Sequence, residues 1–526
     1  MQSSICPGCS HTDIEVPASP VPGLLGSNQI ASTIVAPTIR TAISLAQSDI
    51  LRLDSGIASL ERTTDELRQK RDALQTFATM HLALVSPIHR MPPEILSDIF
   101  LHHCLSARSI DHNRDLSFDK APLLLGNICN KWRMISLSTP RLWTFFRLNV
   151  LSKHLENHVM LAKTWFARAG ACPLTIALQR NTSEHVSLEP LMQVILLHCE
   201  RWHDVSLIMP ISNIKCLAPA RNCIPRLQRL FIQDCGSSHY TKPIDIFENA
   251  PQLRSFDLRS TPISIFKIPY HQLKHSKLFT RKADETLEYL SLTPNLETCE
   301  VSPVKSECQH APVLLRHLRY LCIEVGMLEH PGTFFDRLIL PMLRELYIWL
   351  WNIPWTGIPE LISLLSRGSL EKFKFYSNPT NRHPLSVDMI KVLLASPTIA
   401  ELDLTGSSPQ CMTESFLTRF AYNRHLENGN APQLLPALHT IKVDYTRSFF
   451  DVLAFADAVQ SRMAVNDTDV ATSGVCLKTV EMRCFAWFGA TEPLDSIALS
   501  RLQQLQDLGL DLRIIYGRNV CGEFTI

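Results

Sequence analysis

The chain has 526 residues, 45% hydrophobic and 19% charged, so it can bury a large core and is not globally disordered. Its 51 Lys and Arg residues balance 50 Asp and Glu residues, and this balance gives no indication of a nucleic acid or an anionic membrane as partner. The 16 cysteines are scattered through apolar segments, which favours reduced thiols in a cytoplasmic or nuclear protein.

Residues 1–38 hold several prolines among small polar residues, which is typical of a disordered tail. They carry no basic region followed by an apolar core, and no run in the chain reaches the roughly 18 apolar residues of a membrane helix. Cys6 and Cys9 with His11 could suggest a metal site, but zinc requires a second ligand pair and none lies nearby. We therefore expect a soluble chain with no metal and no cofactor.

Residues 39–85 show a helical pattern, because apolar residues recur at steps of three and four. These positions are Ile43, Ala46, Ile50, Leu53, Ile57, Leu60, Leu67 and Leu74. Thr64 and Arg71 interrupt the seam, and the opposite face is rich in charge. An amphipathic helix is expected, and two interpretations stay open: a self-pairing coiled coil, or a helix that packs on the segment that follows.

Residues 86–149 contain two apolar stretches that belong together. Pro92 and Pro93 precede Glu94, an arrangement typical of a first helical turn, and Ile95, Leu96, Ile99 and Phe100 follow at helical spacing. The second stretch runs from residue 123 to residue 136, with Pro140-Arg141-Leu142-Trp143 beyond it. We expect short helices with more apolar side chains than so small a module can bury.

Together these stretches resemble an F-box, in the form common in long fungal F-box proteins. The resemblance implies a three-helix module that docks on a Skp-type adaptor and through it joins a cullin-based, SCF-type ubiquitin ligase. The adaptor-binding residues that it implies are Pro92, Ile95, Leu96, Ile99, Phe100, Ile128, Cys129 and Trp132. The chain departs from the family pattern at Met91, where Leu is usual, and by a polar insertion over residues 106–120.

After a connecting α/β segment at residues 150–200, one six-residue frame recurs to the end of the chain: apolar-x-x-apolar-x-apolar. The copies are Trp202/Val205/Leu207, Leu227/Leu230/Ile232, Leu253/Phe256/Leu258, Leu273/Ser276/Leu278, Leu296/Cys299/Val301, Leu318/Leu321/Ile323, Leu343/Leu346/Ile348, Leu370/Phe373/Phe375, Ile399/Leu402/Leu404, Leu438/Ile441/Val443, Leu477/Val480/Met482 and Leu505/Leu508/Leu510. Several copies carry proline two residues ahead of the first apolar position.

This spacing is similar to that of leucine-rich repeats. The last two apolar positions predict one face of a short strand, and helical candidates lie between the frames. The predicted fold class is therefore α/β: an N-terminal helix, a three-helix module, and over residues 201–526 an irregular solenoid whose parallel strands line the concave side.

Residues beside the buried pair of each frame should point into the concave face, because side chains alternate along a strand. This places Phe231, Asp257, Arg259 and Asp403 there, together with the candidate target-binding group Tyr347, Trp349, Lys374 and Tyr376. Large aromatic side chains beside a cation are a plausible anchor for a protein partner.

No glycine-rich phosphate loop and no nucleophile elbow occurs in the sequence. His102, His103 and Cys104 are adjacent on an expected helix, so they cannot converge on one metal ion. We expect a non-catalytic substrate receptor of the ligase, with the adaptor, a cullin and an unidentified protein target as partners, and neither nucleic acid nor membrane. The alternative is an interaction scaffold that acts outside a ligase.

Overall fold

The computed structural model describes residues 14–25, 30–106, 122–180, 187–236, 242–279, 282–302, 308–325, 331–350, 358–377, 385–406, 411–422, 433–445, 451–463, 477–484 and 494–516. The chain divides into two compact units, residues 1–96 and 97–526. The Cys6–Cys9 motif and most of the polar insertion lie outside the described residues.

The first unit is dominated by one long helix. After a short 3-10 turn, η2 (Pro22–Leu24), helix α1 runs from Ala36 to Val85. Pro37 suits its first turn, and Pro87 disfavours helical backbone at the residue before it, which accounts for the two ends. The expected N-terminal helix is confirmed, and it begins three residues earlier than the sequence pattern indicated. A second turn, η3 (Pro87–Arg90), leads into the next helix.

The second unit opens with short helices. Helix α2 (Pro93–Ser106) starts at the proline pair and continues into this unit, and α3 (Pro122–Ile128), α4 (Asn130–Ser138) and η5 (Pro140–Trp143) follow. Cys129 caps α4, since its Sγ accepts a hydrogen bond from the Trp132 N–H at 3.5 Å.

A 14-stranded parallel sheet with its strands in chain order forms the rest of this unit. The strands are β1 (Phe145–Asn149), β2 (Leu174–Gln179), β3 (Trp202–Ile208), β4 (Arg229–Gln233), β5 (Ser255–Arg259), β6 (His275–Phe279), β7 (Thr298–Val301), β9 (Tyr320–Val325), β11 (Glu345–Leu350), β12 (Lys372–Ser377), β13 (Glu401–Asp403), β14 (Thr440–Tyr445), β15 (Thr479–Cys484) and β16 (Asp511–Tyr516). Strands β8 (Val313–Leu314) and β10 (Leu338–Ile339) pair separately.

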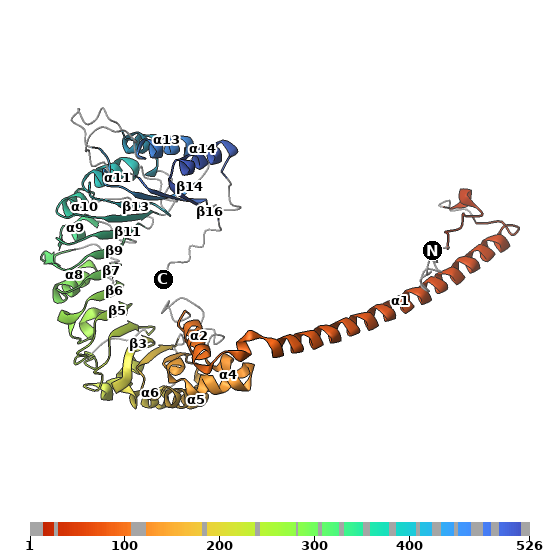
Figure 1. Cartoon of the computed structure of the whole chain (residues 1–526), viewed down its shortest axis with the longest axis horizontal. Coiled ribbons are helices and arrows are strands. Elements are labelled where there is room, and N and C mark those ends of the chain that lie inside the picture. Colours follow the sequence, from red (N-terminus) through yellow and green to blue (C-terminus); the bar gives the residue numbers. More distant parts are fainter. Residues whose placement is uncertain are drawn as a thin grey trace. The chain divides into compact units, whose positions relative to one another are not determined.

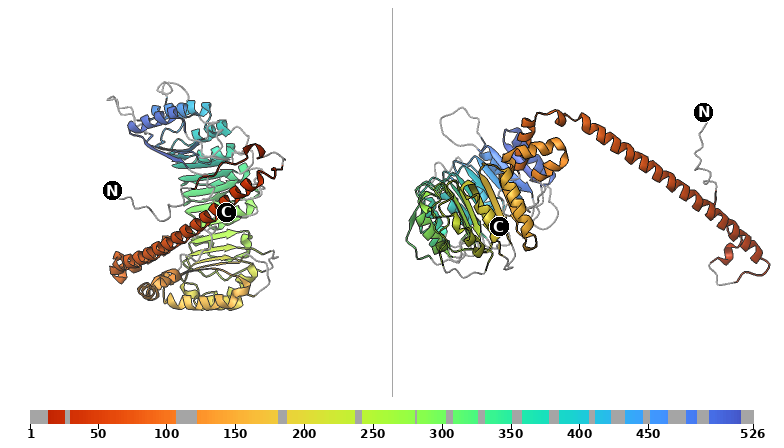
Figure 2. Two further views of the ribbon diagram at one scale, coloured as in Figure 1. Left: turned by 90° about the vertical axis from the view of Figure 1, so that its right-hand side faces the viewer. Right: turned by 90° about the horizontal axis from the view of Figure 1, so that it is seen from below.

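Helices and 3-10 turns connect the strands. The helices are α5 (Leu155–Arg168), α6 (Glu189–Leu196), α7 (Ile211–Ile214), α8 (Ala283–Leu292), α9 (Pro331–Phe335), α10 (Ile358–Leu365), α11 (Leu385–Leu394), α12 (Glu414–Phe420), α13 (Val452–Ser461) and α14 (Ser496–Asp507). They lie along the outer side of a curved sheet whose strands line the inner side (Figure 1). Figure 2 shows the strands stacked in chain order. The predicted α/β solenoid with a concave strand face is confirmed.

The recurring apolar frame forms the core between the sheet and the helices. The register aligns Leu346 with Leu321 on one side and with Phe373 on the other, so each repeat covers its neighbour. In every copy except the last, all three positions are buried. Apolar burial of this kind contributes roughly 25 cal/mol per Å².

The prediction that Leu505, Leu508 and Leu510 form the last frame is wrong. Leu508 follows α14 and is 62% exposed, and the register pairs Val480 with Leu512 rather than with Leu508. Gly509 has φ +100°, a left-handed conformation that ends the helix before the strand begins. Apolar residues at the end of α14 reproduced the frame by coincidence.

The sheet also begins earlier than the expected boundary at residue 201. Strand β1 lies in the segment expected to close the helical module, and β2 lies in the segment expected to connect it to the repeats. Their buried residues, such as Phe146 and Ile176, continue the same core. Neither strand follows the frame closely. Strand β2 agrees with the α/β character expected of residues 150–200, although its place in the sheet was not predicted, and β1 was not predicted at all.

Replacing Leu346 by Asp should lower the free energy of unfolding by about 3–5 kcal/mol, because a charge enters the core without a partner. Leu508→Asp is the matched control, since Leu508 is exposed, and it should change stability by less than about 0.5 kcal/mol. Chemical denaturation followed by circular dichroism measures both. Equal losses in the two variants would contradict the assigned register.

Candidate functional sites

Helix α2 carries two apolar stripes with different surroundings. Leu96 and Phe100 are buried, whereas Ile99 is 43% exposed and Ile95, one helical turn before it, is exposed as well. Pro92, just ahead of the helix, is also exposed. The residues expected to bind an adaptor through α2 therefore divide: Leu96 and Phe100 build the core, and the two isoleucines and Pro92 face outward.

Helices α3 and α4 are fastened to α2 by aromatic and polar contacts. The Trp132 ring lies 4.7 Å from the Phe100 ring, and the Arg133 Nε–H donates to the Gly126 carbonyl at 2.8 Å. Trp132 and Cys129 are half-buried, so both serve the packing of this module. Ile128 is 55% exposed. Further apolar side chains are exposed on the same two helices: Leu123, Leu124, Met134 and Leu137.

Trp143 joins the helical module to the sheet. Its Nε1–H donates to the Ser136 carbonyl at 2.8 Å, and its ring lies 4.9 Å from that of Trp165 on α5. The guanidinium of Arg168, also on α5, lies 4.4 Å from the Trp143 ring. Trp143 is completely buried. The helical module and the first repeat therefore share one core.

The inner face of the sheet is the second candidate site, and the register brings the predicted aromatic group together on it. Tyr347 is level with Lys374, and Trp349 is level with Tyr376. The Trp349 and Tyr376 rings are 4.7 Å apart, and the Lys374 Nζ lies 5.8 Å from the Tyr347 ring and 5.6 Å from the Trp349 ring. Tyr320 adds a further ring 5.0 Å from Tyr347, and this residue was not predicted from the sequence.

Several of these residues are less accessible than expected. Tyr376 is only 8% exposed, because the backbone of Gly406 lies on its ring so closely that a Cβ there would overlap it. Phe231 and Asp403 are buried as well, whereas Tyr347, Trp349 and Lys374 are half-buried. On a concave face, side chains from strands about 4.8 Å apart converge and cover one another, so alternation alone overestimates exposure.

A row of alternating charges along the inner face was not predicted from the sequence. It consists of the residues between the second and third positions of the third to eleventh frames: Asp257, Lys277, Glu300, Cys322, Tyr347, Lys374, Asp403, Lys442 and Glu481. Cys322 and Tyr347, in the middle of the row, are uncharged and separate two alternating runs. Lys277 pairs with Glu300 at 2.8 Å, and Lys374 pairs with Asp403 at 3.3 Å. Aligning the frames would have revealed this change of sign. Its three lysines and four carboxyl groups leave little net charge, so the row does not strongly favour a partner of one sign.

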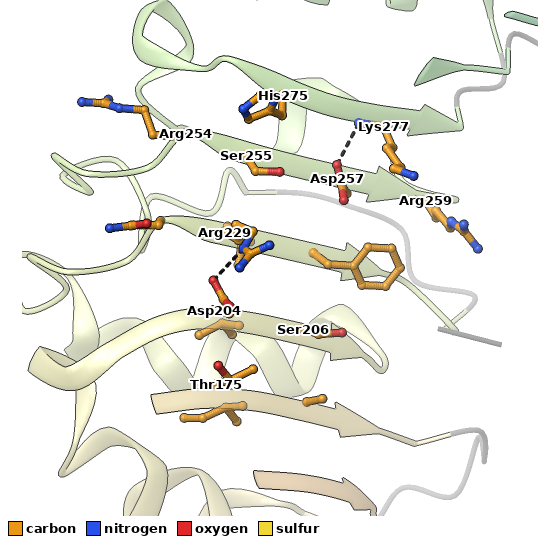
Figure 3. A pocket seen from close by; sticks show the side chains of 16 residues that line it. Thr175, Asp204, Ser206, Arg229, Arg254, Ser255, Asp257, Arg259, His275 and Lys277 are labelled. Carbon is orange, nitrogen blue, oxygen red and sulfur yellow. Dashed lines mark hydrogen bonds and ion pairs between the residues drawn. The ribbon is translucent and has the colours of Figure 1, made fainter. Parts of the chain in front are cut away.

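Strands β2 to β6 surround a hollow of about 530 Å³ on this face (Figure 3). The Arg229 Nε–H donates to the Asp204 carboxylate at 2.9 Å on one side. On the other side, the Asp257 carboxylate accepts the backbone N–H of Lys277 at 2.8 Å. The Arg259 guanidinium lies over the rings of Phe231 and Phe279, at 5.6 and 4.4 Å. The hollow therefore offers charged, hydroxyl and aromatic groups to a bound segment.

Two carboxyl groups on the inner face titrate unusually. Burial raises the pKa of Asp257 to about 7, although the Lys277 ammonium beside it acts in the opposite direction. Burial also raises the pKa of Asp444 to about 6, against the hydrogen bond that its carboxylate accepts from the Gly406 N–H at 2.5 Å. Both groups therefore change charge close to neutral pH.

The raised pKa of Asp257 has a defined effect on stability. Folded protein holds this proton in the range between the ordinary value of 3.8 and about 7, so the free energy of unfolding falls as pH rises through that window. Asp257→Asn, which is neutral at every pH, should be more stable than wild type by about 1–2 kcal/mol at pH 8. Urea unfolding at several pH values should show this advantage shrinking towards pH 4. An advantage that is the same at every pH would contradict the assignment.

The described part of the chain offers neither a metal site nor a membrane span. No group of three or more His, Cys, Asp or Glu side chains within it could hold a metal ion. Its helices include none that is both long enough and apolar enough to cross a bilayer. Cys299 and Cys411, which are both buried, carry free thiols.

Comparison with known proteins gives a structural likeness but does not assign the chain to a family. No protein-family model matches the sequence, and no curated protein matches it. Among solved structures, the chain is similar to a crystal structure of a TLR13–ssRNA13 complex, with 15% sequence identity and a TM-score of 0.30. The match covers 59% of this chain and 38% of the other, so the chain spans well under half the length of that protein.

Proposed function

We propose that the protein is a substrate receptor of a cullin-based ubiquitin ligase. In this proposal, α2, α3 and α4 form an F-box that docks on a Skp-type adaptor, and the inner face of a leucine-rich-repeat solenoid binds a protein target. The chain itself performs no chemistry, because ubiquitin transfer belongs to other subunits of such a ligase.

One observation carries the adaptor part of this proposal. The stretches that resemble an F-box coincide with helices on which Ile99 and Ile128 remain exposed while Phe100 packs inside. Large apolar side chains left outside a small module are typical of interface anchors. For the target part, the support is the half-buried pair Tyr347 and Trp349 beside Lys374, since aromatic residues and cations are enriched where binding energy concentrates.

The adaptor interface can be tested at exposed positions, which spare the core. Ile99→Glu with Ile128→Glu should weaken binding of a purified Skp-type adaptor at least about 100-fold, measured by calorimetry, because two apolar anchors are lost. Met160→Glu with Leu197→Glu is the matched control, since both residues are exposed and apolar but lie outside the module. Thermal unfolding checks that each variant is folded. Unchanged adaptor binding by the first variant would end the F-box assignment.

The target interface is tested separately. Tyr347→Ala with Trp349→Ala should remove target proteins captured after proteasome inhibition, while adaptor binding stays unchanged, because only the inner face is altered. Tyr516→Ala, an exposed aromatic residue on β16, is the matched control and should capture the wild-type set. A set of captured proteins that is identical for all three chains would show that this aromatic group does not bind the target.

The second candidate function, an interaction scaffold outside a ligase, uses the same two surfaces. The two functions differ in whether a cullin is bound to the adaptor. A cullin that co-purifies with the wild-type chain, and is lost with Ile99→Glu and Ile128→Glu, supports the receptor. Adaptor without cullin supports the scaffold.

A further inference from the structure

Helix α1 exposes an apolar seam along most of its length. In a heptad numbered from Ile43, the first position holds Ile43, Ile50 and Ile57. The fourth position holds Leu53, Leu60, Leu67 and Leu74. The exposed fraction of these side chains ranges from 36% at Leu53 to 68% at Leu74. An exposed apolar seam of this kind is normally covered by a partner, since helices gain most of their stability from tertiary packing.

The residue types of the seam indicate what covers it. Isoleucine at the first heptad position with leucine at the fourth is the combination that favours two-stranded, parallel coiled coils. We propose that α1 pairs with α1 of a second copy of this chain in such a coiled coil. The protein then exists as a dimer, with one adaptor-binding module and one inner face contributed by each copy.

The length of the seam sets the size of the contact. From Ile43 to Leu74 it spans about 48 Å at 1.5 Å per residue, and a helix is about 10 Å wide. The contact would therefore cover roughly 480 Å² per helix, which is below the about 800 Å² per partner of a standard interface, so we expect a pair that dissociates on dilution. Because identical seams face each other, the contact closes on itself around a two-fold axis and does not propagate into filaments.

Two polar residues in the first heptad position set the register. In a parallel pair, Thr64 meets Thr64 and Arg71 meets Arg71 of the second copy, which lowers stability but disfavours shifted alignments. The Arg71 guanidinium binds the neighbouring Asp72 carboxylate on its own helix, with Nε at 2.8 Å and Nη2 at 2.5 Å. This ion pair reduces the repulsion between the two arginines.

Off-seam leucines supply a matched control on the same helix. Leu45 and Leu51 occupy the third and second heptad positions and are 62% and 70% exposed. Ile57→Glu with Leu60→Glu changes the seam, and Leu45→Glu with Leu51→Glu adds the same charges beside it. We expect the full-length wild type and the off-seam variant to sediment as dimers at about 10 µM, and the seam variant to sediment as a monomer, with a dissociation constant raised at least about 100-fold.

A third variant should tighten the dimer instead of weakening it, and misfolding of the variant could not cause tighter binding. Arg71→Ile completes the row of isoleucines and removes the like charges, so it should lower the dimer dissociation constant at least about tenfold. A wild type that stays monomeric at about 50 µM, well above ordinary dimer dissociation constants, would overturn the proposal. So would equal weakening by the seam and off-seam pairs, or no tightening by Arg71→Ile. Adaptor binding by each variant, measured in parallel, keeps this outcome independent of the proposed ligase role.

Discussion

Backbone hydrogen bonds that pass from each repeat to the next hold the sheet together. The backbone N–H of the residue directly before a strand donates to the carbonyl of the repeat before it: Arg319 to Glu297, Arg344 to Arg319 and Glu371 to Arg344, with N···O distances of 2.8–2.9 Å. This continuous ladder keeps the strands in unshifted register over most of the sheet, and the register places every buried pair beside the next. No repeat can bury its own apolar face, so each depends on both neighbours.

The sequence was informative wherever the signal was local and periodic. The frame around Leu346, with Pro341 two residues ahead of Leu343, predicts strand, face and turn together, and the structure agrees. The periodic signal gave a wrong prediction in two situations: where a helix produced the same spacing of apolar residues, and where the curvature of the sheet determined the exposure of a side chain. Leu508 satisfies the frame but belongs to the end of a helix, and Tyr376 is covered by Gly406 from the adjacent repeat. Neither fact can be obtained from the spacing of residues within one repeat.

The inner face carries two kinds of side chain that a protein partner could contact. Its paired charges, such as Lys277 with Glu300, are already satisfied within the chain, so they present an ordered pattern of signs and little net charge. Its aromatic residues can supply affinity through apolar contact, and Tyr347 and Trp349 are accessible for that purpose. The raised pKa of Asp257 makes the charge of the hollow depend on pH near neutrality.

Trp143 has a mechanical consequence. Because its indole contacts Ser136 on one side and Trp165 on the other, no tether separates the short helices from the sheet. The outer surface of α3 and α4 and the inner face of the sheet therefore belong to one packed body. Each repeat moves the far end of the inner face about 5 Å further from the short helices and also rotates it, since sheets twist. The number of repeats thus sets both the distance and the angle between these two surfaces.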